Sequence, residues 1–291
     1  MATAAQWVEG ARPRTLPAAV APVLAGTGVA AHLDQAVWWK AVLAGVVALA
    51  LQVGVNYAND YSDGIRGTDA DRVGPLRLVG SGVAAPGAVK RAAFAAFGVA
   101  AVAGLVLAAT TAWWLVAVGA VCVVAAWFYT GGSKPYGYLG LGEVMVFVFF
   151  GLVAVVGTTY VQTESWPPAA VYAAVGIGAI ACALLVANNL RDIPTDEVAG
   201  KRTLAVLLGD GRTRALFVVL LGAAVVALVG VALETTWWAL LALAAALPGS
   251  RAARIVARGT KGRGLVPVLQ LTGTAELFYG VGMFVGLLVG R

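Results

Sequence analysis

The chain contains 291 residues, of which 60% are hydrophobic and 12% are charged, and its formal net charge is +6. A composition this apolar excludes an ordinary soluble globule and is typical of a membrane protein that crosses the bilayer several times. The positive charge does not indicate nucleic-acid binding, because that function needs a basic soluble module and the apolar runs leave no room for one.

Apolar runs long enough to cross a hydrocarbon core of about 30 Å recur along the whole chain. They predict an all-α polytopic membrane protein with nine transmembrane helices, organised as a single transmembrane domain over residues 1–291. The predicted spans are 16–32, 38–58, 92–110, 112–129, 141–161, 168–190, 213–233, 235–248 (extending toward 257) and 266–289.

The positions of the basic residues predict the orientation of these spans. If the N-terminus is cytoplasmic, nine spans leave all but two of the 20 Lys and Arg residues on the inner side, the exceptions being Lys40 and Arg291. The tryptophan pairs 38–39, 113–114 and 237–238 then fall at outer boundaries, where tryptophan anchors helices in the interface. We therefore expect the long polar loops after the second and sixth spans to face the cytoplasm.

The first of these loops follows an acidic cluster at the end of the second span. Asn56, Asp60 and Asp63 have the i, i+4, i+7 spacing that predicts one face of a helix, and Asn59 lies beside them. Carboxylate and amide oxygens are hard ligands that suit Mg²⁺, which commonly bridges one or two carboxylates to substrate phosphates.

A second acidic cluster follows the sixth span, in the sequence Asn188-Asn-Leu-Arg-Asp-Ile-Pro-Thr-Asp196. Asp192 and Asp196 are four residues apart, a spacing that also predicts one face of a helix, although Pro194 between them is expected to bend or end the helix. Both clusters have basic neighbours, which are Arg66, Arg72 and Arg77 for the first and Arg191, Lys201 and Arg202 for the second. Carboxylates for Mg²⁺ together with Arg and Lys for phosphate oxygens predict a diphosphate site.

Two other interpretations fit part of this pattern. Acidic residues beside arginines at helix ends can be surface ion pairs worth about 0–1 kcal/mol each, but two such clusters at matching positions on one membrane face argue against it. A transporter with an intramembrane cation site is the non-enzymatic alternative, and it would favour acids in mid-membrane rather than at the edge. Glu276, inside the last span, is explained by neither interpretation.

These residues resemble the UbiA superfamily of intramembrane prenyltransferases. The first family motif, Asn-Asp-x-x-Asp-x-x-x-Asp, matches Asn59, Asp60 and Asp63, but its last acid would fall on Gly67 and the chain has Asp69 instead. The second motif, Asp-x-x-x-Asp, matches Asp192 and Asp196. Four longer stretches, at residues 12–17, 59–82, 129–143 and 188–206, resemble the branch of menaquinone synthesis that prenylates 1,4-dihydroxy-2-naphthoate.

The resemblance implies helices around a central cavity that opens to lipid, with both motifs at the cytoplasmic end, in a bacterial cell membrane. It implies two Mg²⁺ ions that hold a polyprenyl diphosphate, whose prenyl group is transferred to 1,4-dihydroxy-2-naphthoate with loss of diphosphate and CO₂. Another acceptor, such as 4-hydroxybenzoate, is the alternative within the superfamily. Chain length and oligomeric state are left open.

The expected roles of the site residues follow from this scheme. The predicted metal ligands are Asp60, Asp63, Asp192 and Asp196, with Asn56 and Asn59 in support. The predicted diphosphate ligands are Lys201, Arg66 and Arg191, with Arg72, Arg77 and Arg202 nearby. The predicted contacts to the acceptor's carboxylate or hydroxyls are Arg12, Arg14, Tyr129 and Lys134.

Overall fold

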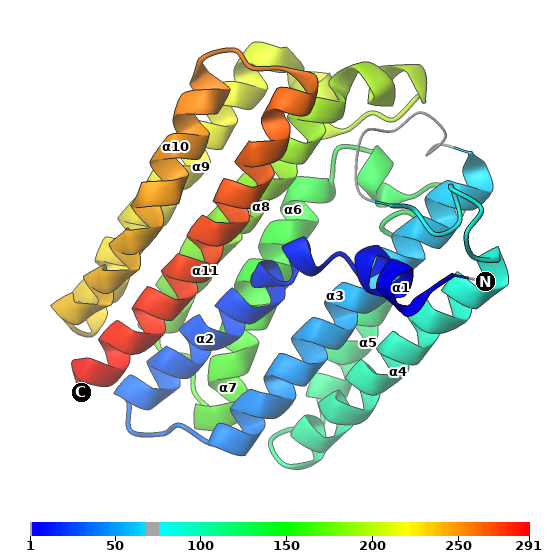
Figure 1. Ribbon diagram of the computed structural model, residues 1–291. Coiled ribbons are helices and arrows are strands. Elements are labelled where there is room, and N and C mark those ends of the chain that lie inside the picture. Colours follow the sequence, from blue (N-terminus) through cyan, green and yellow to red (C-terminus); the bar gives the residue numbers. More distant parts are fainter. Residues whose placement is uncertain (1, 68–75) are drawn as a thin grey trace.

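The structure is a computed structural model that describes residues 2–67 and 76–291. Within these residues every regular element is helical, and the long helices run side by side as one bundle (Figure 1). The elements are α1 (Ala4–Gly10), η1 (Pro13–Thr15), α2 (Pro17–His32), α3 (Trp38–Arg66), α4 (Pro86–Ala109), α5 (Leu115–Phe128), η2 (Tyr136–Tyr138), α6 (Gly142–Val146), η3 (Phe147–Val156), α7 (Gly157–Thr163), α8 (Pro168–Val198), α9 (Leu204–Glu234), η4 (Trp237–Ala245), α10 (Ala246–Ala257), η5 (Gly262–Leu265) and α11 (Val266–Val289). The predicted all-α membrane fold is confirmed.

Each predicted span coincides with one helix or with one run of consecutive helices. Among the described residues, seven of these are long and apolar enough to cross a membrane, and α2 with the segment before it (4–15) becomes an eighth if the 50° bend between them lies within one span. The ninth, α5, has 14 residues, or about 21 Å at 1.5 Å per residue, which is less than a full hydrocarbon core.

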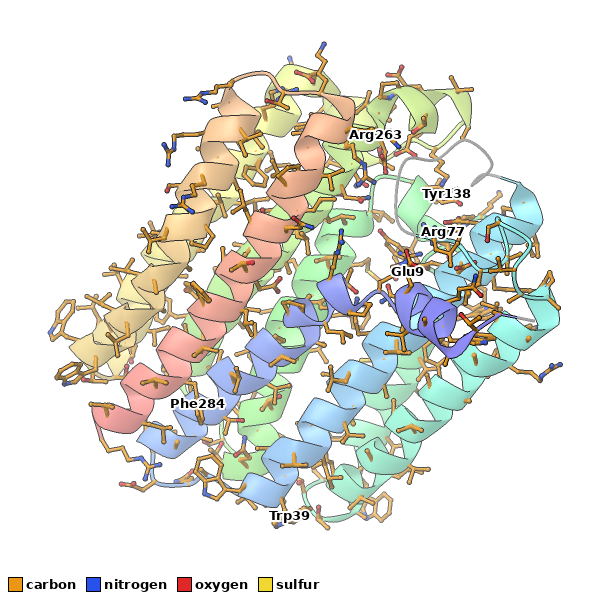
Figure 2. The ribbon with its side chains drawn as sticks, viewed as in Figure 1. Glu9, Trp39, Arg77, Tyr138, Arg263 and Phe284 are labelled. Carbon is orange, nitrogen blue, oxygen red and sulfur yellow. The ribbon has the colours of Figure 1, made fainter. Side chains whose placement is uncertain are left out.

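The two ends of the bundle differ in chemistry. Trp39, at the start of α3, lies at one end, whereas Glu9, Arg77 and Tyr138 gather at the other (Figure 2). The C-terminal turns of α3 and α8, which carry the two acidic clusters, both reach this polar end (Figure 1). The fold therefore brings together two motifs that are far apart in the sequence.

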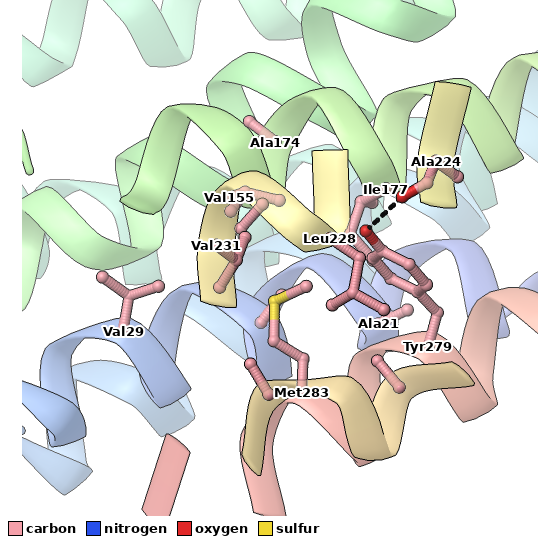
Figure 3. Close-up of a cluster of buried hydrophobic side chains, with 14 of the residues drawn as sticks. Ala21, Val29, Val155, Ala174, Ile177, Ala224, Leu228, Val231, Tyr279 and Met283 are labelled. Atoms are coloured by element: carbon pink, nitrogen blue, oxygen red, sulfur yellow. Dashed lines mark hydrogen bonds between the residues drawn. The ribbon is translucent and has the colours of Figure 1, made fainter. Parts of the chain in front are cut away.

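Small residues allow α2 and α11 to pack closely against each other. A Cβ at Gly280 of α11 would lie 2.7 Å from the Cα of Ala21 on α2, so only glycine fits at this crossing. Figure 3 shows the buried cluster around it, in which the Tyr279 hydroxyl donates a hydrogen bond of 2.9 Å to the carbonyl of Ala224. This satisfies the polar tip of a side chain that is otherwise surrounded by apolar groups.

Two helix ends determine where the acidic clusters lie. α3 continues two turns beyond the predicted span and ends at Gly67, whose φ of +71° is the left-handed conformation that a glycine adopts readily. α8 continues through Pro194 to Val198, so the expectation that the helix could end at this proline is wrong. Asp192 and Asp196 therefore lie one turn apart on a single helix.

Glu276 is the exception to the apolar packing of α11. Its side chain is fully buried, and within the described chain neither carboxyl oxygen has a hydrogen-bond partner. A buried polar group without a partner costs about 1–3 kcal/mol. Because Glu276 does not line the cavity described below, we expect Glu276→Met to raise the thermal unfolding midpoint and to leave turnover near the wild-type value. Thermal unfolding and activity of the same preparation test this, and a loss of activity in a folded protein would give Glu276 a functional role.

Candidate active site

A cavity of about 1310 Å³ lies inside the bundle, and most of its wall comes from α2, α3, α4, α5, η3, α7 and α8. Apolar side chains line most of its length, and they include Val47, Leu51, Leu107, Leu115, Phe149, Phe150 and Val153. Charged and amide side chains line the end that lies beside the two acidic clusters, and they include Asn59, Asp63, Arg77, Asn188, Arg191, Asp192, Asp196 and Lys201. The cavity therefore has a polar end and an apolar channel, as an amphiphilic substrate requires.

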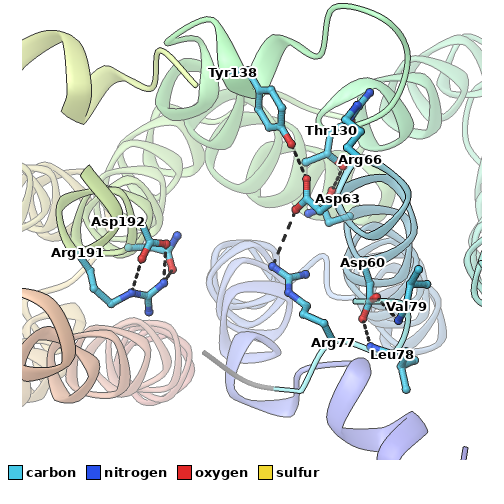
Figure 4. A network of polar contacts seen from close by, with 12 residues as sticks. Asp60, Asp63, Arg66, Arg77, Leu78, Val79, Thr130, Tyr138, Arg191 and Asp192 are labelled. Atoms are coloured by element: carbon cyan, nitrogen blue, oxygen red, sulfur yellow. Dashed lines mark hydrogen bonds and ion pairs between the residues drawn. The ribbon is translucent and has the colours of Figure 1, made fainter. Parts of the chain in front are cut away.

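The α3 wall of the polar end is built around Asp63. This carboxylate accepts a hydrogen bond of 2.5 Å from the Tyr138 hydroxyl, and it lies 4.0 Å from the guanidinium of Arg77. One turn earlier, the Asn59 side-chain oxygen accepts a hydrogen bond of 2.7 Å from the Thr130 hydroxyl. These contacts fix the direction of the Asp63 carboxylate (Figure 4) and of the Asn59 side-chain oxygen, and both residues line the cavity.

The α8 wall carries the second acidic cluster. The Arg191 guanidinium grips Asp192 with two hydrogen bonds of 2.7 Å, and it donates a third, of 2.9 Å, to the side chain of Asn188. Asp196 follows one turn later, and its carbonyl accepts a hydrogen bond of 2.8 Å from the backbone of Lys201. A bidentate pair of this kind holds both side chains in fixed geometry.

Tyr138 connects the two walls, and it is not among the residues predicted from the sequence. Besides its hydrogen bond to Asp63, its ring lies 4.6 Å from the ammonium of Lys201, and its carbonyl accepts a hydrogen bond of 3.0 Å from the backbone of Arg202. The sequence of segment 129–143 pointed to Tyr129, but nothing in it distinguished Tyr138 from Tyr136. The contacts that identify Tyr138 come from residues more than 60 positions away.

Tyr136, in the same segment, has a different role. Its hydroxyl donates a hydrogen bond of 2.8 Å to the carbonyl of Ala125, and burial raises the pKa of Tyr136 to about 12. Its ring packs edge-on against Tyr129 at 5.5 Å, and both tyrosines line the cavity, so Tyr136 supports Tyr129 as a neutral group.

The N-terminal segment closes the cavity from a third side, with Arg12 and Arg14 in its wall. It is tied to α3 by Asn56, whose side-chain nitrogen donates hydrogen bonds of 2.9 Å to the carbonyl of Ala11 and 3.0 Å to the hydroxyl of Thr15. Asn56 therefore lines the cavity and also anchors the segment that carries two of the predicted arginines.

Asp60 lies elsewhere, despite its place in the motif. Its side chain is fully buried, and its oxygens accept hydrogen bonds of 2.8 Å from the backbone amide of Leu78 and 2.9 Å from that of Val79. It does not belong to the cavity wall. The spacing in the sequence placed Asp60 and Asp63 on one face, whereas in the structure the boundary of the cavity passes between them.

Three further predicted residues also lie outside the cavity wall. The Arg66 guanidinium donates hydrogen bonds to the carbonyls of Thr130 and Gly132, and Lys134 and Arg202 are exposed. Arg72 and Asp69 lie outside the described residues. The predicted residues that do reach the cavity are Arg12, Arg14, Asn56, Asn59, Asp63, Arg77, Tyr129, Arg191, Asp192, Asp196 and Lys201.

The polar end suits a divalent ion that is shared with a ligand. In the ranges 2–67 and 76–291, no three His, Cys, Asp or Glu side chains converge closely enough to hold a metal ion by themselves. The carboxylate and amide oxygens are instead divided between the α3 and α8 walls. Mg²⁺ favours such partial sites, because it keeps several waters and completes its shell with substrate phosphates.

Proteins with similar sequences match this chain over nearly its whole length. Residues 19–268 match the model of the UbiA prenyltransferase family. A protein of Mycobacterium tuberculosis named 1,4-dihydroxy-2-naphthoate octaprenyltransferase is 58% identical over 291 residues, which cover 100% of this chain and 99% of that protein. An Escherichia coli protein of the same name is 37% identical over 298 aligned positions, which cover 98% and 96%.

Solved structures show the same fold at much lower identity. The apo structure of a UbiA homolog from Aeropyrum pernix superposes with a TM-score of 0.72 and 15% identity, over 92% of this chain and 97% of that one. A UbiA homolog from Archaeoglobus fulgidus bound to GPP and Mg²⁺ superposes with a TM-score of 0.66 and 14% identity, over 96% and 99%. The chain belongs to the UbiA prenyltransferase family.

Proposed function

We propose that the protein transfers a polyprenyl group from its diphosphate to 1,4-dihydroxy-2-naphthoate, with release of diphosphate and CO₂, in menaquinone biosynthesis. The observation that carries this proposal is full-length identity of 58% to a protein named for that reaction, in a chain whose cavity joins a polar, cation-rich end to an apolar channel. We further propose that residues 1–291 act as one domain of a bacterial cell membrane, with the polar end toward the cytoplasm, where most basic residues lie.

The diphosphate would bind between the two walls of the polar end. Arg77 on one side and Arg191 and Lys201 on the other line the cavity and carry the positive charge that phosphate oxygens need. Asp63 with Asn59, and Asp192 with Asp196, would hold divalent ions, for which we propose Mg²⁺ and two sites. Mg²⁺ bound there would neutralise the negative charge that develops on the departing diphosphate.

We propose that the pair between Arg191 and Asp192 opens when diphosphate binds. The guanidinium satisfies the carboxylate and compensates a charge that is costly to bury. A diphosphate beside Arg191 offers that guanidinium new oxygen partners and leaves Asp192 available for an ion. The side chains exchange partners without either charge being left alone.

The prenyl chain and the acceptor require different parts of the cavity. When the allylic C–O bond breaks, the cationic carbon must meet an electron-rich ring before it meets water, and the apolar walls keep the channel dry. The ring gains a bond to the prenyl carbon and its carboxyl group leaves as CO₂. Arg12, Arg14 and Tyr129, which also line the cavity, would hold the acceptor's carboxylate and hydroxyls.

A bulky residue in the apolar channel should discriminate between substrates by length. Gly104 of α4 lines the channel, and its own Cβ position has no neighbour within 4 Å. We expect Gly104→Phe to lower kcat/KM for octaprenyl diphosphate at least about tenfold relative to geranyl diphosphate. The reason is that the longer prenyl chain needs the part of the channel that the phenylalanine ring would fill. The matched control is Gly98→Phe, at an exposed position of the same helix that does not line the cavity. Equal effects of both variants, or of both substrates, would contradict this use of the channel.

A comparison of acceptors tests the proposed function. Purified protein in lipid is incubated with a polyprenyl diphosphate, Mg²⁺ and either 1,4-dihydroxy-2-naphthoate or 4-hydroxybenzoate, and the lipid products are identified by mass spectrometry. We expect product with the naphthoate and a rate with the benzoate that is lower by orders of magnitude. Product with 4-hydroxybenzoate alone would overturn the choice of acceptor, and no product with either would overturn the enzymatic proposal.

A further inference from the structure

Asp60 is surrounded by backbone rather than by cavity. Its two carboxylate oxygens accept hydrogen bonds from consecutive amides, at 2.8 Å from Leu78 and 2.9 Å from Val79, and the side chain is fully buried. An N–H group directs its positive hydrogen at a lone pair where a cation would otherwise bind. The carboxylate of Asp63, by contrast, lines the cavity.

The geometry of α3 explains why two acids of one motif face different surroundings. At about 100° per residue, Asp63 lies about 60° around the helix axis from Asp60. Asn59 lies beyond Asp63 in the same direction and also lines the cavity, whereas Tyr57 lies on the other side of Asp60 and donates a hydrogen bond of 2.8 Å to the carbonyl of Trp7. Asp60 is therefore on the part of α3 that holds other chain segments in place.

The segment that Asp60 holds, residues 76–81, is called the strap here. Packing reinforces the two hydrogen bonds, because the side chain of Leu78 is fully buried. It lies so close to Gly10 of α1 that a Cβ there would be 2.7 Å from Cδ1 of Leu78. On the other side, a Cβ at Gly64 would lie 2.5 Å from Cγ1 of Val79. The strap therefore packs closely against α3 and α1.

The strap carries one cavity-lining cation. Arg77 immediately precedes the two anchored amides, and its guanidinium lies 4.0 Å from Asp63 and lines the polar end (Figure 4). Its backbone position is thus determined by Asp60, while its head faces the carboxylate that opens onto the cavity. The connection from Asp60 to Arg77 runs through two hydrogen bonds and one residue of backbone.

We propose that Asp60 is a positioning residue, which binds the backbone of the strap and so determines where Arg77 meets the diphosphate, and that it is not a ligand of a divalent ion. The part of this proposal that concerns diphosphate rests on the proposed function. The part that concerns the anchored amides does not, and it is tested separately.

The first test uses the wild-type protein and Mg²⁺ alone. Hydrogen–deuterium exchange of peptides covering the strap is measured by mass spectrometry in the absence and presence of saturating Mg²⁺. If Asp60 binds the strap, its amides exchange slowly in both conditions. If Asp60 were a metal ligand, Mg²⁺ would draw the carboxylate away from the amides, and faster exchange in the presence of Mg²⁺ would overturn the proposal.

The second test removes one acceptor without changing the size of the side chain. Asp60→Asn leaves one amide of the strap opposite an NH₂ group, so we expect exchange at Leu78 or Val79 to accelerate about 10- to 100-fold. Asp192→Asn, on the other wall, is the matched control and leaves this exchange at the wild-type rate. Unchanged exchange in folded Asp60→Asn would overturn the anchoring role. If that variant does not fold, the wild-type measurement alone decides.

The third test separates positioning from metal binding in the kinetics. We expect Asp60→Asn to raise KM for the polyprenyl diphosphate about tenfold and to leave the Mg²⁺ concentration for half-maximal rate unchanged, whereas Asp63→Asn raises that concentration. Because Asp60 acts through Arg77, the double variant Asp60→Asn with Arg77→Ala should raise KM no more than Arg77→Ala alone does. Additive losses, or an altered Mg²⁺ requirement in Asp60→Asn, would overturn the proposal. Failure of the proposed function would appear instead as absence of turnover in wild-type protein with intact protection of the strap.

Discussion

Asp63→Ala is expected to lower kcat/KM for the polyprenyl diphosphate by about 10²- to 10³-fold in a protein that remains folded. Asp63 is the carboxylate of the first motif that opens onto the cavity, and Tyr138 fixes its direction through a hydrogen bond of 2.5 Å. Its removal would delete the proposed metal ligand on the α3 wall and also one ion-pair partner of Arg77. Steady-state kinetics at saturating Mg²⁺ measures the loss.

A matched control for this variant lies at the opposite end of the bundle. Asp34 is in the connection between α2 and α3, its side chain is 80% exposed, and it lies 3.8 Å from Arg291. Asp34→Ala makes the same chemical change on the surface, where an ion pair contributes little, and should retain wild-type kinetics. Near-normal turnover in Asp63→Ala, or an equal loss in Asp34→Ala, would contradict the role of Asp63.

Removal of divalent ions should have an even larger effect. With an excess of EDTA we expect turnover to fall below detection, because the walls of the polar end would then place carboxylates against a diphosphate with nothing between them. Added Mg²⁺ should restore the wild-type rate in full. In Asp192→Ala the same addition should restore little activity, since Asp192 and Asp196 together supply the carboxylates of the α8 wall.

This experiment also distinguishes an ion at the site from an ion bound elsewhere. A structural ion would change the thermal unfolding midpoint of the protein when the chelator removes it. Full turnover in EDTA, with a chelator concentration far above that of the protein, would contradict the divalent-ion part of the proposed function.

Hydropathy predicted the fold well, because the bilayer imposes one length on every apolar helix. The nine predicted spans each coincide with a helix or a run of helices, and α3 shows where such reasoning ends. Its apolar residues stop near residue 58, but the helix continues to Arg66, because its polar last turns are covered by the N-terminal segment and the strap. Hydropathy does not register a cover that comes from another part of the chain.

The candidate site was predictable where one helix supplies the geometry. Asp192 and Asp196 lie one turn apart on α8 and both line the cavity, as their spacing predicted. The spacing of Asp60 and Asp63 also predicted one shared face, but the carboxylate of Asp60 is hydrogen-bonded to backbone amides of the strap. A rotation of about 60° around α3 decides between the two environments, and no local pattern in the sequence gives the position of the strap.

Residues whose role depends on contacts between distant segments could not be assigned from the sequence. Tyr138 became apparent from its contacts with Asp63 and Lys201, which lie on either side of it in the chain. The position of Arg66 beside the first motif predicted a phosphate ligand. Its guanidinium instead donates hydrogen bonds to two carbonyls of the segment 129–143. In both cases the decisive partner is a backbone or side-chain group from a distant part of the chain.

The measurement that tests the central claim most directly follows the carboxyl carbon of the acceptor. The protein is incubated with Mg²⁺, a polyprenyl diphosphate and 1,4-dihydroxy-2-naphthoate labelled with ¹³C in its carboxyl group, and labelled CO₂, diphosphate and the lipid product are quantified together. We predict equal amounts of all three, with a prenylated product that lacks the label. A product that retains the label, or CO₂ released without prenyl transfer, would contradict the account.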